Sequence, residues 1–301
     1  MVSASAFAPA KINLHLSVGP KRPDGFHDLL SLFHMIDLAD WITVTLRKSS
    51  RFSVNIQMEQ CDPIFNNTMI RAANIYAERT GLTALVNIVC RKRIPIEAGL
   101  GGGSSDGATV LMLMNQLCAD PLSTRELSDI GACIGSDVPF FLGESAASCI
   151  EGRGEYLTAL TERDDLFGLI IMPSHAAVST ARAFGDLDAA RASGLPVSPS
   201  PSKEELITMF ASDVRHWRFF NDFRAVSGPL RSLYEVLDAL VDEQEELFGT
   251  LSGSGAAYCV LGNHHEKLDR FRRKLEETRV NVTLYDIKCL HRAHSGVTVS
   301  L

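Results

Sequence analysis

The feature that most constrains this chain is the glycine-rich stretch Gly99–Ser105. The apolar segment before it, Leu85–Cys90, is typical of a strand, and the run after it extends to Leu117 as a helix. In this setting glycines let backbone N–H groups converge on an anion, and the helix N-terminus adds partial positive charge. A flexible turn is the alternative. Four glycines and two serines in seven residues favour an anion-binding loop.

The loop differs from two common phosphate-binding patterns. No lysine follows the glycines, as a Walker A motif requires, and their spacing does not fit the G-x-G-x-x-G dinucleotide fingerprint. The formal net charge of −7 disfavours a general nucleic-acid binder, because such proteins present a positive field. The sequence therefore predicts local binding of a small anionic ligand.

The length of the chain and the order of its expected strands and helices predict two lobes. It has 301 residues, 46% of them hydrophobic, and at roughly 150 residues per domain that is about two domains. Strands alternate with helices in both halves, and each half carries a glycine-rich turn, which indicates an α+β or α/β enzyme. We expect a first lobe at 1–155 and a second at 156–301, with about the last 15 residues returning to the first.

Local patterns predict individual elements. Strands are expected at 10–18, 41–46, 85–90, 166–172 and 256–261. Helices are expected at 68–79, from the glycine loop to 117, from the Ser123-x-x-Glu126 capping box to about 131–135, after Ser202, and at 229–248 and 266–279. The stretch 181–202 ends in alternating serines and prolines and is predicted to be an exposed loop, and 251–255 a glycine-rich turn.

Cysteine usage and hydropathy indicate a cytoplasmic protein. The seven cysteines include no C-x-x-C pair, so reduced thiols are expected and a zinc site is disfavoured; they are Cys61, Cys90, Cys118, Cys133, Cys149, Cys259 and Cys289. The longest apolar stretches, 166–172 and 110–114, are far shorter than the roughly 18 residues of a membrane span. The N-terminus lacks the basic region of a signal peptide. We therefore expect neither membrane nor nucleic-acid partners.

Two charged residues are candidates for chemistry, although neither is persuasive alone. Lys11 shares a strand face with Asn13, and a lysine there is usually solvated. Asp137 lies in the segment Gly135–Pro139, where an aspartate most often caps a turn. Together with a phosphate loop, however, a carboxylate can accept the proton of an attacking hydroxyl, and an ammonium can stabilise the developing charge.

Three segments, in this order and spacing, resemble the motifs of the galactokinase, homoserine kinase, mevalonate kinase and phosphomevalonate kinase (GHMP) superfamily. They are Ala8-Pro9-Ala10-Lys11-Ile12-Asn13-Leu14, the Gly99–Ser105 loop, and Leu251-Ser252-Gly253-Ser254-Gly255-Ala256. The turn Arg22-Pro23-Asp24-Gly25-Phe26-His27, with Leu32-Phe33, narrows the resemblance to one branch. Its acceptor is 4-diphosphocytidyl-2-C-methyl-D-erythritol, of the non-mevalonate (MEP) pathway to isoprenoids. The resemblance is weakest from 186 to 218.

The resemblance implies an α+β fold of two lobes: an N-terminal ATP-binding lobe like ribosomal protein S5 and a C-terminal ferredoxin-like lobe. It implies ATP-dependent phosphorylation of the acceptor's 2-hydroxyl, with Lys11 and Asp137 as the catalytic pair. The residues expected around ATP are Pro95, Gly99, Leu100, Gly101, Gly102, Gly103, Ser104 and Ser105. Those expected around the acceptor are Asn13, Phe26, His27, Phe33, Thr180, Phe184, Gly253, Ser254 and Gly255.

Two departures from the family pattern concern the site. Phe26 stands where tyrosine is usual, which removes a hydroxyl and keeps the aromatic face, and Glu97 replaces a small residue ahead of the loop. Mg²⁺ is expected with ATP; a hydroxyl of Ser104 or Ser105 is a candidate ligand, and the sequence assigns no acidic one. A monomer or weak homodimer is expected.

Two other functions stay open at this point. One is a sibling small-molecule kinase, of the homoserine or mevalonate type, which the Asp24–His27 turn disfavours. The other is a catalytically silent nucleotide- or sugar-binding regulator on the same fold. Retention of both Lys11 and Asp137 with an intact loop counts against it, since a silent protein has no chemical need for the pair.

Overall fold

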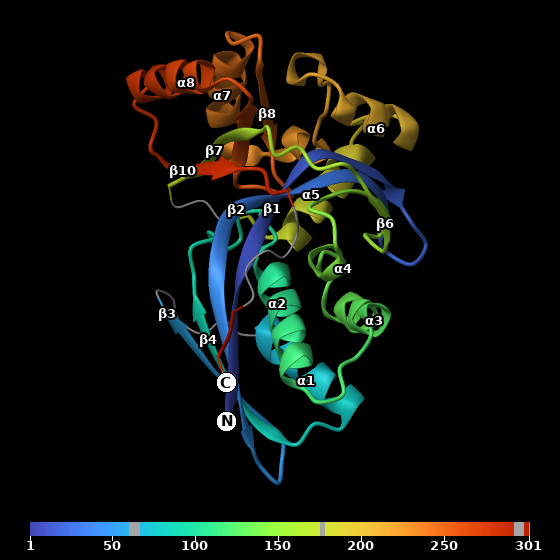
Figure 1. The fold of residues 1–301 in the computed structure, drawn as a ribbon. Coiled ribbons are helices and arrows are strands. Elements are labelled where there is room, and N and C mark those ends of the chain that lie inside the picture. Colours follow the sequence, from blue (N-terminus) through green and yellow to red (C-terminus); the bar gives the residue numbers. More distant parts are fainter. Residues whose placement is uncertain (60–66, 175–177, 292–297, 301) are drawn as a thin grey trace.

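A computed structural model describes residues 1–59, 67–174, 178–291 and 298–300 of the chain. Two lobes, each made of helices packed on a sheet, lie end to end (Figure 1). The N- and C-termini lie together at the far end of the first lobe. This is the expected α+β architecture of two lobes. Cys61, named above, lies outside the described residues.

The first lobe is built on a seven-stranded sheet. Its order is β11-β1-β2-β4-β3, with β5 pairing with β2 and β6 with β5. The strands are β1 (Val2–Lys21), β2 (His27–Lys48), β3 (Ser53–Glu59), β4 (Ala84–Arg91), β5 (Ala147–Gly152), β6 (Tyr156–Ala159) and β11 (Thr298–Ser300). Strands β1 and β2 form one long antiparallel hairpin that reaches from the termini into the second lobe (Figure 1).

Helices α1, α2 and α3 lie on one face of this sheet, and the short α4 lies beside them (Figure 1). Their bounds are Thr68–Thr80, Gly102–Leu117, Thr124–Ile134 and Val138–Leu142. Local chemistry sets their ends: Asn67 accepts a hydrogen bond from the N–H of Met69 to cap α1, and Gly81 ends it in the left-handed region. The predicted capping box of Ser123 and Glu126 starts α3.

The second lobe is built on a four-stranded sheet of order β10-β7-β9-β8. Its strands are β7 (Phe167–Pro173), β8 (Leu247–Leu251), β9 (Tyr258–Gly262) and β10 (Val282–Lys288). Its helices are α5 (Thr180–Ala192), α6 (Lys203–Ala211), α7 (Arg231–Asp242) and α8 (His265–Glu277). Three 3₁₀ turns, at Val214–His216, Asp222–Val226 and Gly228–Leu230, join α6 to α7.

The two lobes share a hydrophobic core. Ile12 and Leu14 of β1 pack in one cluster with Ile170 of β7 and Cys259 of β9. On the opposite face of β1, Lys11 and Asn13 are also buried, at 4% and 2% exposure. This stretch of β1 is therefore covered on both sides, and its polar face lies where the two lobes meet.

Most predicted helices, and the strands predicted at 85–90, 166–172 and 256–261, are confirmed to within a few residues. The strands predicted at 10–18 and 41–46 are segments of the much longer β1 and β2, and two predictions are wrong. The stretch 181–202 holds helix α5, whose single buried ridge of Ala183 and Leu187 is too narrow to give a clear helical pattern. The helix expected at 229–248 ends at Asp242, because the chain turns and its last apolar pair, Leu247 and Phe248, begins β8. Residue 251 consequently belongs to that strand rather than to the following turn. The division after residue 155 stays a prediction.

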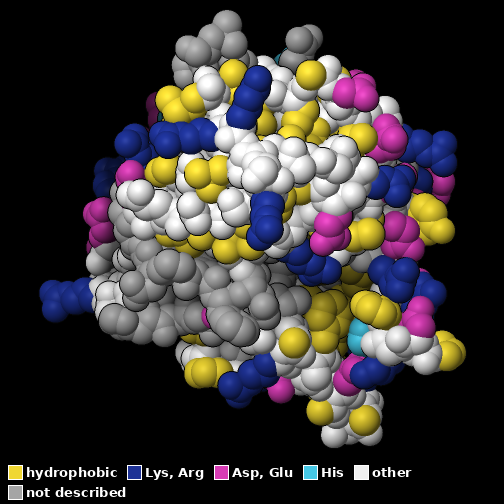
Figure 2. Space-filling model, turned by 90° about the horizontal axis from the view of Figure 1, so that it is seen from below, with side chains coloured by type: hydrophobic (Ala, Val, Ile, Leu, Met, Phe, Trp, Pro, Cys, Tyr) yellow, Lys and Arg dark blue, Asp and Glu magenta, His cyan; other side chains and the backbone are white. Residues whose placement is uncertain are grey.

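None of the helices in the described part of the chain is long and apolar enough to cross a bilayer. Basic and acidic side chains are interspersed over the face seen from the end that holds the termini (Figure 2).

Candidate active site

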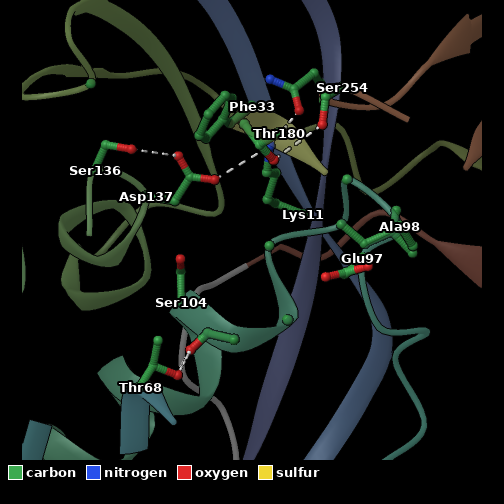
Figure 3. Close-up of a pocket in the computed structure, with 18 of the residues that line it drawn as sticks. Lys11, Phe33, Thr68, Glu97, Ala98, Ser104, Ser136, Asp137, Thr180 and Ser254 are labelled. Atoms are coloured by element: carbon green, nitrogen blue, oxygen red, sulfur yellow. Dashed lines mark hydrogen bonds and ion pairs between the residues drawn. The ribbon is translucent and has the colours of Figure 1, made fainter. Parts of the chain in front are cut away.

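A cavity of about 420 Å³ lies where the glycine loop, β1 and the second lobe meet. Most of the residues predicted for the site line it: Lys11, Asn13, Phe33, Pro95, Gly99, Leu100, Gly101, Gly102, Gly103, Ser104, Asp137, Thr180, Phe184, Gly253 and Ser254. Ser105, Phe26, His27 and Gly255 do not belong to this lining. Figure 3 shows Lys11 and Asp137 facing each other across the space above Ser104.

Hydrogen bonds join the three motifs that are far apart in the sequence. The N–H of Lys11 donates to the carbonyl of Leu100, at 2.9 Å. The Ser252 hydroxyl donates to the carbonyl of Gly99 and accepts from the N–H of Asn13, at 2.9 and 3.2 Å. Strand β1, the glycine loop and the 252–255 turn therefore form one rigid unit.

The loop requires glycine at two positions. Gly99 and Gly101 have φ of +76° and +69°, the left-handed region that other residues rarely adopt. A Cβ at Gly99 would lie 2.1 Å from the Ser252 carbonyl oxygen, and one at Gly101 would lie 2.9 Å from Cγ of Lys11. The loop thus lies directly against its neighbours, as expected of backbone that cradles an anion.

Helix α2 begins at Gly102 and directs its N-terminus at the cavity. The first N–H groups of an α-helix have no partner within the helix, and they carry partial positive charge. Ser104, in the first turn, places its side chain on the lining, while Ser105 is fully buried. The predicted phosphate loop therefore has the geometry of a helix-terminal anion site.

Lys11 and Asp137 form an ion pair on the cavity wall. The distance between Lys11 Nζ and Asp137 Oδ2 is 3.5 Å, and the side chains are 5% and 27% exposed. Lys11 Nζ also donates to Oδ1 of Asn13 and lies 4.2 Å from the ring centre of Phe33. Burial lowers the pKa of Lys11, and the Asp137 carboxylate opposes that shift.

A second lysine on the lining was missed by the sequence interpretation. Lys92 Nζ lies 2.5 Å from Oδ2 of Asp40 and 2.8 Å from Oδ2 of Asp106. Asp40 also accepts from the N–H groups of Arg93 and Ile94, at 2.5 and 2.9 Å. Burial raises the pKa of Asp106 to about 7; Lys92 opposes this shift, and the nearby Asp40 carboxylate reinforces it. In the sequence, Lys92 lies in the basic run Arg91-Lys92-Arg93. Such runs are usually solvated, so nothing marked Lys92 as a site residue.

Another part of the cavity lining is aromatic. Phe184 lines it and stacks on the imidazole of His27, with ring centres 5.1 Å apart. Nε2 of His27 lies 2.8 Å from Oδ1 of Asp188, which also pairs with Lys21. The ring of His27 is therefore fixed from two sides, and its contact with Asp188 had no signal in the sequence, because 186–218 could not be matched.

The described residues include no cluster of three or more His, Cys, Asp or Glu side chains that could hold a metal ion. Ser104, on the lining, is better placed than the buried Ser105 to reach a metal from the cavity. Glu97 also lines the cavity, and its φ of +53° lies in the left-handed region, which residues other than glycine rarely adopt.

Comparison with known proteins identifies relatives along almost the whole chain. Residues 67–144 match the family model for the GHMP kinases N terminal domain. The 4-diphosphocytidyl-2-C-methyl-D-erythritol kinase of Treponema pallidum (strain Nichols) is 35% identical over 288 residues, which cover 91% of this chain and 95% of the relative.

Solved structures agree with these sequence matches. A crystal structure of 4-(cytidine 5'-diphospho)-2C-methyl-D-erythritol kinase has a TM-score of 0.70 at 28% identity, covering 94% of this chain and 99% of the other. A homoserine kinase from Cytophaga hutchinsonii has the same TM-score at 20% identity, covering 99% and 97%, and shows a shared fold alone. The chain belongs to the 4-diphosphocytidyl-2-C-methyl-D-erythritol kinase family of the GHMP kinases.

Proposed function

We propose that the chain transfers the γ-phosphoryl group of ATP to the 2-hydroxyl of 4-diphosphocytidyl-2-C-methyl-D-erythritol, giving the 2-phosphate and ADP. The observation that carries the proposal is the Lys11–Asp137 pair, which faces a cavity between an anion-binding helix terminus and an aromatic wall. Membership of the family adds the identity of the acceptor.

Asp137 is the proposed general base. Its carboxylate is partly exposed to the cavity, so it can accept the proton of the acceptor hydroxyl as the new P–O bond forms. Lys11 holds that carboxylate and stabilises the charge that develops on the transferred group. Asn13 and Phe33 fix the ammonium between them, which supports a positioned and not a mobile lysine.

The Gly99–Ser104 loop and the first turn of α2 are proposed to hold the ATP phosphates. The positive φ of Gly99 and Gly101 and the position of the α2 N-terminus on the cavity support this, because such backbone lets N–H groups converge on an anion. Mg²⁺, when bound with ATP, neutralises phosphate charge, and the Ser104 hydroxyl would be its protein ligand.

The aromatic part of the cavity lining is proposed to bind cytosine. Phe184 offers a ring face, and stacking on such a face is worth roughly 1–3 kcal/mol per base in nucleic-acid complexes. Stacking discriminates poorly between bases, so selectivity requires polar contacts, for which His27, outside the lining but stacked on Phe184, is the candidate. Gly253, Ser254 and Thr180 would line the path between base and hydroxyl, and Thr180 and Ser254 hydrogen-bond each other at 3.1 Å.

We further propose that the enzyme works in the cytoplasm, as a monomer or weak homodimer. Cys118, Cys133, Cys149, Cys259 and Cys289 are free thiols, which supports a reducing compartment.

The test is a coupled ADP-release assay with a panel of alcohols. Turnover is expected with the CDP-linked methylerythritol, and the UDP-linked counterpart should be a much poorer substrate. Replacement His27→Ala should raise the KM for the CDP compound and reduce the preference. Equal use of the CDP and UDP compounds would contradict cytosine recognition. Rapid turnover of homoserine or mevalonate instead would assign the chain to a sibling activity.

A further inference from the structure

A third cation lines the cavity and has no role in the function proposed above. Arg153 lies in the turn between β5 and β6, with Gly152 and Gly154 on either side. Both glycines have positive φ, of +71° and +116°, so the backbone of the turn is sharply bent. A Cβ at Gly154 would lie 2.9 Å from Cβ of Ser136, so the turn packs against the residue that precedes Asp137.

The Arg153 side chain lies on an aromatic ring. Its guanidinium carbon is 4.9 Å from the centre of the Phe26 ring, in the turn between β1 and β2. Cation–π contacts of this kind orient a guanidinium without neutralising it. Arg153 therefore lies between two features of the site: the reacting carboxylate on one side, through Ser136, and the turn that carries His27 on the other.

The charges of the cavity lining distinguish Arg153 from the other two cations. Lys11 pairs with Asp137, and Lys92 pairs with Asp40 and Asp106. Among the residues that the structure describes, no carboxylate lies within ion-pair distance of the Arg153 guanidinium, whose contact is with the Phe26 ring. An arginine stays charged at all physiological pH values and presents a planar fork of donors that matches phosphate oxygens. This cation is available to an anionic ligand.

We propose that Arg153 binds the diphosphate of the acceptor substrate, with the Phe26 ring holding the guanidinium in place. This inference rests on the proposed function. Covalent connectivity places the diphosphate between the cytosine, proposed to lie at Phe184, and the hydroxyl, proposed to lie at Asp137. Arg153 is on the cavity lining, its guanidinium lies on the ring of Phe26, and its turn packs against Ser136, the neighbour of Asp137. Because ATP also carries phosphate oxygens, the experiment must separate the two sources.

The experiment compares ligands that differ only in their phosphates. Calorimetric affinities for cytidine, CDP and ADP are measured for the unmodified protein and for Arg153→Gln, which keeps length and loses charge. The affinity for CDP is expected to fall about tenfold, as for loss of a charge-assisted hydrogen bond, while cytidine and ADP change less than about twofold. Arg153→Lys should lie between, since it keeps the charge and loses the fork.

Kinetics supply a second readout. The KM for the CDP-linked acceptor should rise about tenfold, with kcat and the KM for ATP nearly unchanged, because the contact is made equally in the ground and transition states. The matched control is Arg125→Gln, at an exposed arginine on α3, which should leave all of these values unchanged.

Each other outcome overturns the proposal. Equal losses of cytidine and CDP affinity would mean that Arg153 only supports the shape of the pocket. A loss of ADP affinity with CDP unaffected would assign the guanidinium to the ATP phosphates, and unchanged values would remove it from the site. Failure of the proposed function looks different: the unmodified protein would then neither bind cytidine and CDP nor phosphorylate the CDP-linked alcohol.

Discussion

Lys11 and Lys92 are two buried lysines on the wall of one cavity, and their pKa values are shifted in opposite directions. Lys11 faces one carboxylate, Asp137, at 3.5 Å, and burial lowers its pKa. Lys92 lies between two, Asp40 and Asp106, at 2.5 and 2.8 Å; burial opposes its charge, yet the two carboxylates raise its pKa. Two close carboxylates outweigh burial at Lys92, whereas one carboxylate at 3.5 Å does not outweigh it at Lys11.

This difference assigns a catalytic role to the Lys11 pair and a structural role to the Lys92 cluster. The partner of Lys11 is 27% exposed and faces the cavity, so the pair can reorganise around a substrate. The cluster of Lys92 ties β2, through Asp40, to α2, through Asp106, which follows the first turn of that helix. We therefore expect changes at the Lys11 pair to affect turnover and changes at the Lys92 cluster to affect stability.

The largest expected effect is on turnover. Asp137→Asn keeps the shape and the hydrogen-bonding capacity of the side chain but cannot accept a proton, so kcat should fall by about 10²–10⁴. The melting temperature and the calorimetric affinity for ADP should stay close to those of the unmodified protein. Asp129→Asn, at an exposed aspartate on α3, is the matched control. A variant at position 137 with near-normal kcat would leave Asp137 only a role in its turn.

The second prediction concerns stability and compares the two lysines directly. Lys92→Met leaves two buried carboxylates without their cation, which should lower the free energy of unfolding by about 3–5 kcal/mol. Lys11→Met should change it by less than about 1 kcal/mol, because Asp137 keeps access to water, and should instead reduce kcat. Urea unfolding followed by circular dichroism measures both. Equal losses of stability in the two variants would erase the distinction between the lysines.

The contrast also shows what the sequence could predict. The glycine loop stands out from local chemistry alone, because it is a run of glycines between an expected strand and an expected helix. Lys11 and Asp137 became candidates for catalysis only together with that loop and through the resemblance. Most helices followed from local periodicity, whereas only segments of the two long strands did. The resemblance of three motifs led us to expect that they meet at one cavity. In the structure, hydrogen bonds between β1, the glycine loop and Ser252 hold them together.

What the sequence could not predict depends on distant partners. Lys92 looks like a surface residue until Asp40, 52 positions away, is folded against it. The stacking of His27 on Phe184 and its contact with Asp188 likewise depend on α5, a helix that sequence patterns did not reveal. Arg153 becomes a candidate binding residue only from its surroundings in the structure: its guanidinium contacts the Phe26 ring, and no carboxylate of the described residues lies within ion-pair distance of it.

The third prediction uses pH to test the Lys92 cluster. The pKa of Asp106 is about 7 in the folded protein, against about 3.9 in an unfolded chain. Between these values the folded state binds a proton that the unfolded state does not, so the free energy of unfolding falls as pH rises from about 4 to 7. Above pH 7 this contribution stays lost.

Asp106→Asn should remove this dependence while retaining an oxygen to accept from Lys92. His15 and His34, buried with pKa values lowered to about 4, have the opposite sign: they cost stability as pH falls from about 6.5 to 4. The informative quantity is therefore the difference between the variant and the unmodified protein, from urea unfolding at pH 5, 6, 7 and 8. Parallel curves would show that Asp106 is already ionised throughout this range.

The smallest effects are expected at two adjacent glycines, each of which covers one of the lysines. A Cβ at Gly101 would lie 2.9 Å from Cγ of Lys11, whereas one at Gly102 would lie 3.0 Å from Cγ2 of Ile94 and 3.5 Å from Nζ of Lys92. Gly101→Ala also forces alanine to a φ of +69°, so it should displace Lys11 and lower kcat, by about tenfold if the displacement costs about 1.4 kcal/mol.

Gly102→Val should act on binding instead. Its φ is outside the left-handed region, but the added methyl groups crowd Ile94 at the first turn of α2, where phosphates are proposed to approach the backbone. The affinity for ADP should therefore fall several-fold, with a smaller change in kcat than Gly101→Ala produces. Calorimetry and steady-state kinetics on both variants separate the two effects. Normal ADP binding by Gly102→Val would place the phosphate cradle elsewhere, and normal kcat in Gly101→Ala would mean that the reaction tolerates movement of Lys11.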